Sequence, residues 1–175
     1  MSRPTYLVLL LSLFVFSACE VLEDHAFTVT GSEVGFTFPE QHESNSYHLT
    51  KEVDNPDIEG RLKDRGLPVN MLSSVKLASL TLFLDSDDPN FDVSSITNVK
   101  VNASLAGRSS IAIATGDFTG WQGDDALLTV ADVELLEYVT AETMEFTIRF
   151  EVTEQPAAPI DVRLEPEFTA VTSLF

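Results

Sequence analysis

Few side chains in this sequence have the types and spacing that nucleophilic catalysis requires. Acyl transfer needs a nucleophile, a base that activates it and a group that orients the base. No G-x-S-x-G motif occurs, and the Gly107–Ser110 segment has the wrong spacing for one. The three histidines, His25, His42 and His48, all lie in the first third of the chain, and we interpret them as surface residues. The sequence therefore predicts no enzyme.

One acidic turn has the ligand types of a metal site. Its oxygen-bearing side chains, which are the kind that calcium prefers, are Asp85, Asp87, Asp88, Asn90 and Asp92. Pro89 stands where an alternating loop would place its next ligand, and Asp-Pro-Asn is also ordinary turn chemistry. We keep this turn as the candidate metal site and predict that it does not bind calcium tightly.

Trp121 is the only tryptophan and lies between two glycines, Gly120 and Gly123. On an exposed loop its ring could stack on a sugar or on a partner's side chain, which makes it the candidate ligand-binding residue. The alternative is that it caps the core. The chain has 28 acidic residues, but no carboxylate pair is singled out for glycoside hydrolysis. No zinc site or cofactor is expected, because His42 and His48 lack helical i, i+4 spacing and no cysteine lies near them.

The formal net charge of −18 narrows the range of partners. Nucleic-acid phosphates need a basic surface, so we predict no nucleic-acid partner. The same charge disfavours electrostatic adhesion of the chain as a whole to anionic lipid. A solvated acidic surface that keeps the protein soluble is the simplest interpretation.

The first 19 residues have the three parts of a secretory signal. Arg3 supplies the cationic start, Tyr6–Phe16 is an unbroken apolar run, and Ser17 and Ala18 are small residues before Cys19. The apolar run is shorter than the roughly 20 residues that cross a bilayer.

The Phe16–Cys19 segment resembles the bacterial lipobox, although Phe16 replaces the usual leucine. The resemblance implies that residues 1–18 are removed and that Cys19 carries lipid, which anchors the protein to a membrane. Cys19 is the only cysteine, so no internal disulfide can form and lipidation accounts for its presence. We expect a cell-envelope protein on the outer membrane. An ordinary signal peptide with a chance cysteine is the alternative.

The rest of the sequence is typical of β-strands, because apolar residues alternate with polar ones. Segments 98–105 and 144–152 show this most clearly, and segment 75–85 is apolar enough to be buried on both faces. Further strands are predicted at 34–38, 47–53, 111–114, 126–130, 160–164 and 168–172, the last two separated by Pro166. A helix is predicted from Asn55, a capping residue, to Gly66, and a helical turn at 133–139.

These elements predict an all-β protein, an antiparallel two-sheet β-sandwich with one short helix between early strands. We expect residues 19–33 to form an acidic tether and residues 34–175 to form the sandwich. The order of elements from 55 to 172 resembles uncharacterised β-sandwich lipoproteins of the Bacteroidota, a group that implies a fold and no chemistry. The expected function is a non-catalytic structural or interaction module with an unknown protein or glycan partner. The alternative is a carbohydrate- or ligand-binding β-sandwich.

Overall fold

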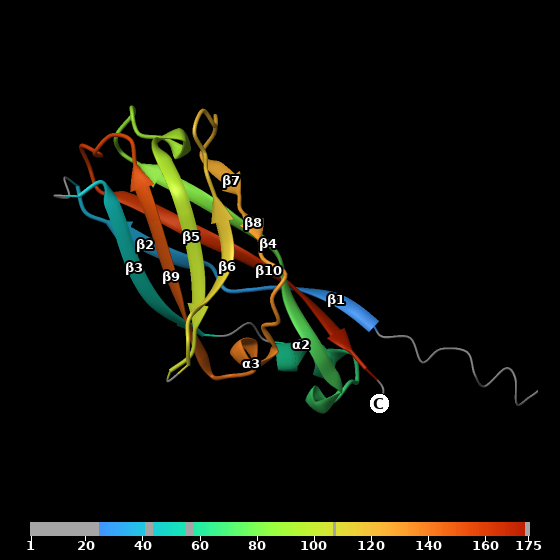
Figure 1. Cartoon of the computed structure of the whole chain (residues 1–175). Helices are drawn as coiled ribbons and strands as arrows, with labels where there is room; N and C mark the ends of the chain where they lie inside the picture. Colours follow the sequence, from blue (N-terminus) through green and yellow to red (C-terminus); the bar gives the residue numbers. More distant parts are fainter. Residues whose placement is uncertain (1–24, 41–43, 55–57, 107, 174–175) are drawn as a thin grey trace, which may run out of the picture.

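Two antiparallel β-sheets pack face to face in the computed structural model, which describes residues 25–40, 44–54, 58–106 and 108–173 (Figure 1). The first sheet consists of β1 (His25–Thr30), β2 (Val34–Phe38), β4 (Leu72–Ser86), β7 (Asp125–Leu127) and β10 (Ile160–Thr172). The second consists of β3 (Ser46–Asp54), β5 (Ile96–Ser104), β6 (Ile111–Gly116), β8 (Thr129–Val130) and β9 (Thr143–Val152). This arrangement confirms the predicted all-β sandwich.

Short helices lie between the strands. They are α2 (Ile58–Asp64), α3 (Leu136–Val139) and two 3₁₀ turns, η2 (Val69–Met71) and η3 (Val93–Ser95). Helix α2 is the predicted helix between early strands, although Asn55 and Pro56, expected to start it, lie outside the described residues. It ends at Asp64, and Gly66, two residues later, has a φ of 69° in the left-handed region that glycine adopts readily. No helix in the described part of the chain is long and apolar enough to span a membrane.

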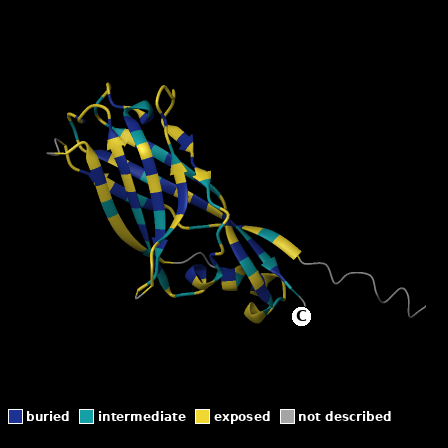
Figure 2. Cartoon of the chain, viewed as in Figure 1, coloured by how far each residue is buried: buried dark blue, intermediate teal, exposed yellow. Residues whose placement is uncertain are grey.

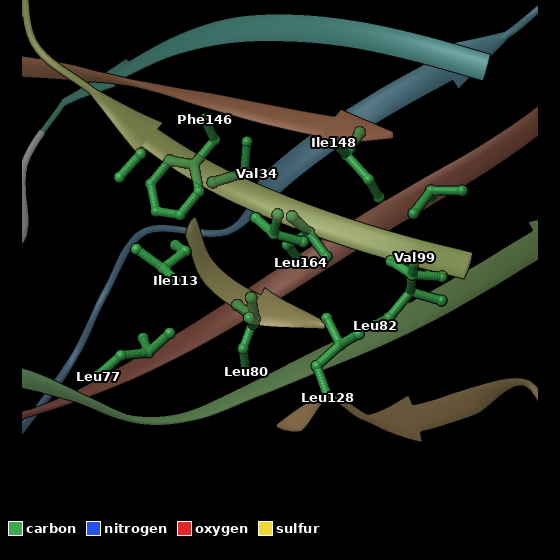
Figure 3. Close-up of a cluster of buried hydrophobic side chains, with 14 of the residues drawn as sticks. Val34, Leu77, Leu80, Leu82, Val99, Ile113, Leu128, Phe146, Ile148 and Leu164 are labelled. Atoms are coloured by element: carbon green, nitrogen blue, oxygen red, sulfur yellow. The ribbon is translucent and has the colours of Figure 1, made fainter. Parts of the chain in front are cut away.

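The core lies between the sheets and is built from alternate residues of each strand. Figure 2 shows buried and exposed positions alternating along the ribbons, and Figure 3 shows the inward side chains meeting in the middle. In β9, Phe146, Ile148 and Phe150 are all at most 1% exposed. At one edge the ring of Phe150 stacks on Tyr47 with centroids 5.2 Å apart. Burial of this apolar surface is the main favourable term in folding.

Strand β4 differs from the expectation that it is buried on both faces. Leu80, Leu82 and Leu84 point into the core, whereas Thr81 and Phe83 are only partly covered on the outer face. Phe83 is shielded there by the Arg163 guanidinium, 5.2 Å from its ring centroid. The outer face therefore accepts an apolar residue because a neighbouring cationic side chain covers it.

Residues 25–30, which were predicted to belong to the tether, instead form strand β1 of the first sheet. Strand β1 pairs antiparallel with β10 over six residues, from His25 opposite Thr172 to Thr30 opposite Glu167. Phe27 and Val29 alternate with threonines, which is the strand pattern, and Val29 is buried. The sandwich therefore includes β1 in addition to the residues from Val34 onward that were predicted to form it.

Strand β10 is continuous over 13 residues, so Pro166 does not divide it as the sequence suggested. Pro166 pairs with Leu80 on one side, and on the other its carbonyl oxygen accepts a hydrogen bond from Gly31 N at 2.9 Å. On that side the partner of β10 changes from β2 to β1. In an antiparallel sheet the N–H and C=O of one residue point to the same side of the strand. The N–H that Pro166 lacks would therefore point toward β1 and β2, not toward β4. The proline therefore removes no hydrogen bond to β4.

Segment 126–130, predicted as one strand, is divided between the two sheets. Strand β7 pairs with β4 in the first sheet, and β8 pairs with β6 in the second. Leu128 lies between them and is 3% exposed, and its N–H donates to the Leu80 carbonyl. The chain crosses from one sheet to the other here because burying Leu128 closes this side of the core.

Glu134 joins α3 to the edge of β4. Its carboxylate accepts hydrogen bonds from Ser74 Oγ at 2.7 Å, Val75 N at 2.8 Å and Leu136 N at 2.9 Å. Partial burial of the Glu134 carboxyl would raise its pKa, but these hydrogen bonds outweigh it and leave the pKa below the ordinary value. The carboxylate thus satisfies free backbone groups where β4 has no strand partner.

We predict that Gly31→Ala destabilises the protein. A Cβ at this position would lie 2.8 Å from both Phe168 Cε2 and Pro166 Cγ, two rings held in the core. Overpacking of this kind costs about 1–3 kcal/mol of unfolding free energy, measurable by urea denaturation.

Gly35→Ala is the matched control, because a Cβ there has nothing within 4 Å. It should be neutral or stabilising by up to about 1 kcal/mol. Equal unfolding midpoints for the two variants would contradict the close packing at the β1–β2 junction.

Candidate functional site

The acidic turn after β4 uses its carboxylates to shape the backbone. Asp88 Oδ1 accepts from Asn90 N at 3.0 Å, and Asp88 Oδ2 accepts from Ala157 N at 2.9 Å. The hydrogen bonds from Ala157 and Asn90 lower the pKa of the Asp88 carboxyl below its usual value. Asp92 caps η3 by accepting from Ser94 N at 2.9 Å. Two of the five predicted metal ligands are therefore engaged by the protein's own donors.

The remaining candidate ligands do not complete a metal site. Asp85 still belongs to β4, where it faces Asp161 on the neighbouring strand rather than the turn. Asp87 and Asn90 are exposed. Among the described residues, no group of three or more Asp, Glu, His or Cys side chains converges in the way that metal binding requires. The sequence grouped these residues because they are close in the chain, but the strand and the turn direct them differently.

We predict that millimolar calcium does not raise the melting temperature of the protein relative to a sample with chelator. A tight site would stabilise the fold by about 4 kcal/mol at a thousandfold excess of calcium over its dissociation constant, a shift that a thermal melt detects readily. A rise of several degrees that Asp87→Asn abolishes would show that the turn does bind calcium.

The two described histidines lie on different sheets. His25 starts β1 in the first sheet, and His48 lies on the exposed face of β3 in the second, opposite Arg149. His42 lies outside the described residues. The structure therefore does not bring His25 and His48 together.

Trp121 is held by its own loop and leaves part of its ring exposed. The indole Nε1–H donates to the Asp125 carbonyl oxygen at 2.7 Å, and the ring packs edge-on against Phe118 with centroids 6.4 Å apart. The residue is nevertheless 47% exposed. The loop around it takes backbone conformations suited to glycine, since Gly120 and Gly123 have positive φ. The Trp121 ring is thus a rigid apolar surface with its polar atom already paired.

Leu127 is a second exposed apolar residue, close in sequence to Trp121. It lies on the short edge strand β7, two residues after the carbonyl that Trp121 binds, and is 63% exposed. Asp124 and Asp125, both exposed, lie between the two residues in sequence. We call Trp121, Leu127 and these two aspartates the loop-end patch. The sequence singled out Trp121 but not Leu127, because a predicted strand at 126–130 does not show which of its faces is exposed to solvent.

The opposite end of the molecule has a second group of exposed residues that the sequence did not single out. The Arg65 guanidinium lies over the Phe27 ring of β1, 4.5 Å from its centroid. Beside it, the segment after α2 exposes Val69, the third large hydrophobic residue found exposed in the described ranges. Shallow hollows flank this segment, one of them lined by His25, Phe27 and Leu67. This contact between Arg65, just after α2, and Phe27 of β1 was not predicted, because residues 19–33 were expected to form a tether.

Comparison with known proteins finds only weak structural similarity. No protein-family model matches the chain, and no curated protein matches its sequence. Among solved structures, the VP2 subviral particle of infectious bursal disease virus aligns with a TM-score of 0.40 and 12% identity, over 86% of this chain and 33% of the VP2 chain. The decameric BFDV capsid protein aligns with a TM-score of 0.41 and 11% identity, over 86% and 99%. The chain spans about a third of the VP2 length, and similarity this low transfers no function.

Proposed function

We propose that this protein is a lipoprotein of the bacterial cell envelope, anchored through lipid on Cys19, and that its β-sandwich is a non-catalytic interaction module. The observation that carries the proposal is the short distance in sequence between the anchor and the fold. Cys19, the last residue of the lipobox-like segment, lies outside the described residues, and β1 starts six positions later at His25. At about 3.5 Å per residue, a chain of that length spans at most roughly 20 Å.

The charged groups with displaced pKa values support a structural role for the module. Asp132 raises the pKa of Lys76 through a hydrogen bond and ion pair with a Nζ–Oδ1 distance of 2.6 Å. Hydrogen bonds from Thr119 within its own loop lower the pKa of Asp117. Asp88 and Glu134 are likewise bound to the backbone that they shape. Each shift therefore has a local structural cause, whereas catalytic sites shift pKa values to suit a reaction.

The loop-end patch is the surface that we assign to the partner. Trp121 and Leu127 supply apolar area at little cost in conformational entropy, since Trp121 is already fixed by Asp125 and Phe118. Rigid aromatic anchors of this kind carry much of the binding energy in protein interfaces. The neighbouring aspartates would favour a partner with basic side chains.

A second candidate function is glycan binding at the same patch. The observation in its favour is the exposed part of the Trp121 ring, because an indole face can stack on the apolar face of a sugar. Trp121 is the only tryptophan of the chain, so its fluorescence reports directly on this surface.

We predict that the full chain, expressed in a bacterium supplied with labelled palmitate, incorporates the label, and that Cys19→Ser abolishes incorporation. The acyl chains need the Cys19 thiol and the amino group exposed by cleavage before it. Equal label in both proteins would refute the anchor. Ser17→Thr, which leaves the cysteine in place, serves as a control for processing of the signal.

A further inference from the structure

The end of the molecule where β1 starts is the end that a lipid on Cys19 would hold near a membrane. In Figure 1 the start of β1, the start of β4, the end of β10 and α2 lie together at this end. Ser173 N donates to the Met71 carbonyl at 2.8 Å, which joins the end of β10 to η2. We call it the N-terminal end. The loop-end patch lies toward the other end of β4, because Leu84 N donates a hydrogen bond to the Asp124 carbonyl oxygen. Leu84 is 12 residues along β4 from Leu72, which corresponds to roughly 40 Å of strand.

Three cationic side chains lie on or just after α2 at this N-terminal end, together with two exposed carboxylates, Glu59 and Asp64. Arg61, Lys63 and Arg65 fall within five positions and are all exposed. Among the described residues, none of the three forms an ion pair with a carboxylate within 4.0 Å. Arg65 instead donates to the Arg61 carbonyl and lies over the Phe27 ring. Residues 58–71 thus carry three cations and two carboxylates, a formal charge of +1, on a chain whose formal net charge is −18.

Apolar side chains are exposed directly beside these cations. Val69 is 39% exposed, Pro68 is exposed and Leu67 is half-buried, all in the segment that joins α2 to β4. A hollow between α2 and this apolar segment is lined by Glu59, Lys63, Gly66, Leu67, Pro68 and Val69. Cations beside exposed apolar residues are typical of segments that lie at a membrane interface, where the charges contact phosphates and the apolar groups reach the acyl boundary.

Two described turns at the other end of the molecule, residues 86–95 and 117–124, carry carboxylates and no Lys or Arg. These carboxylates are Asp87, Asp88, Asp92, Asp117 and Asp124, and Asp125 follows at the start of β7. The negative net charge disfavours adhesion of the whole chain to anionic lipid. The uneven distribution of charge would nevertheless orient the domain relative to the bilayer. A negatively charged bilayer would attract Arg61, Lys63 and Arg65 and repel the acidic loops.

We propose that the α2–η2 segment is a second membrane contact, in which Arg61, Lys63 and Arg65 bind phospholipid headgroups and Val69 enters the interface. This inference rests on the proposed anchor at Cys19, because the lipid brings this end within reach of the bilayer. The contact holds the sandwich upright and turns the loop-end patch toward a partner.

The test uses the lipidated full chain in vesicles of phosphatidylethanolamine and phosphatidylglycerol with brominated acyl chains, which quench tryptophan on contact. A reporter variant carries V69W together with W121F, and the wild-type protein reports from Trp121. We expect the fluorophore at position 69 to lose most of its emission relative to vesicles without bromine, and Trp121 to keep its emission. Quenching of neither position, or of Trp121 alone, overturns the inference.

Charge-reversal variants test whether Arg61 and Lys63, rather than any exposed cation, hold position 69 at the bilayer. R61E with K63E in the reporter background should restore emission at position 69, because phosphate contacts are lost. K100E with R149E is the matched control, since these cations lie on the exposed face of the second sheet, and it should leave quenching unchanged. Equal effects of the two pairs would overturn the role of α2. N70W, at another exposed position of η2, replaces V69W if that variant does not fold.

Vesicle flotation distinguishes failure of this inference from failure of the anchor. If the protein floats with the vesicles but position 69 is not quenched, the anchor stands and the second contact is wrong. If the protein carries no lipid and does not float, the proposed function itself fails, and the inference fails with it.

Discussion

The antiparallel pairing of β4 with β10 is the constraint on which the rest of the structure depends. Both strands run the length of the molecule, and every other strand of the first sheet hydrogen-bonds to one of them. Their inward residues, such as Leu82 and Leu164, face the second sheet and form the centre of the core (Figure 3). Because side chains alternate along a strand, a slip of one residue would turn this apolar row toward solvent. The register is thus fixed by burial.

The way β10 changes partner explains how one pair of strands supports both ends of the molecule. On the side away from β4, β2 covers its first half and β1 its second. The change occurs where Pro166 has no donor to offer and where Gly31 leaves room for two core rings. Bulges near Glu167 and Val171 adjust the register with β4 over the second half. The N-terminal end is therefore a continuation of the sandwich sheet.

The sequence predicted best the elements whose own residues determine them. Strands β5 and β9 alternate apolar and polar residues, and α2 stops before the predicted Gly66, so the local pattern was sufficient to predict them. The errors fell on short strands defined by their partners. Strand β1 is recognisable only from its pairing with β10, and the division between β7 and β8 depends on the burial of Leu128.

For the candidate sites, proximity in sequence grouped the Asp85–Asp92 carboxylates, but strand direction and turn hydrogen bonds separate them. Trp121 was found by residue type, whereas the Arg65 and Val69 surface arises only from tertiary contact.

Continuity of the β4–β10 pair is the central claim, because it links the proposed membrane-facing end rigidly to the loop-end patch. Native-state hydrogen exchange on the full chain measures it, since amides of one cooperative unit open with a common free energy. We expect the hydrogen-bonded amides of Leu72–Leu77 and Phe168–Thr172 to open with the same free energy as those of Leu80–Leu84 and Ile160–Leu164. Exchange of the first group at a much lower free energy would show that the N-terminal end unfolds on its own, which would contradict the claim.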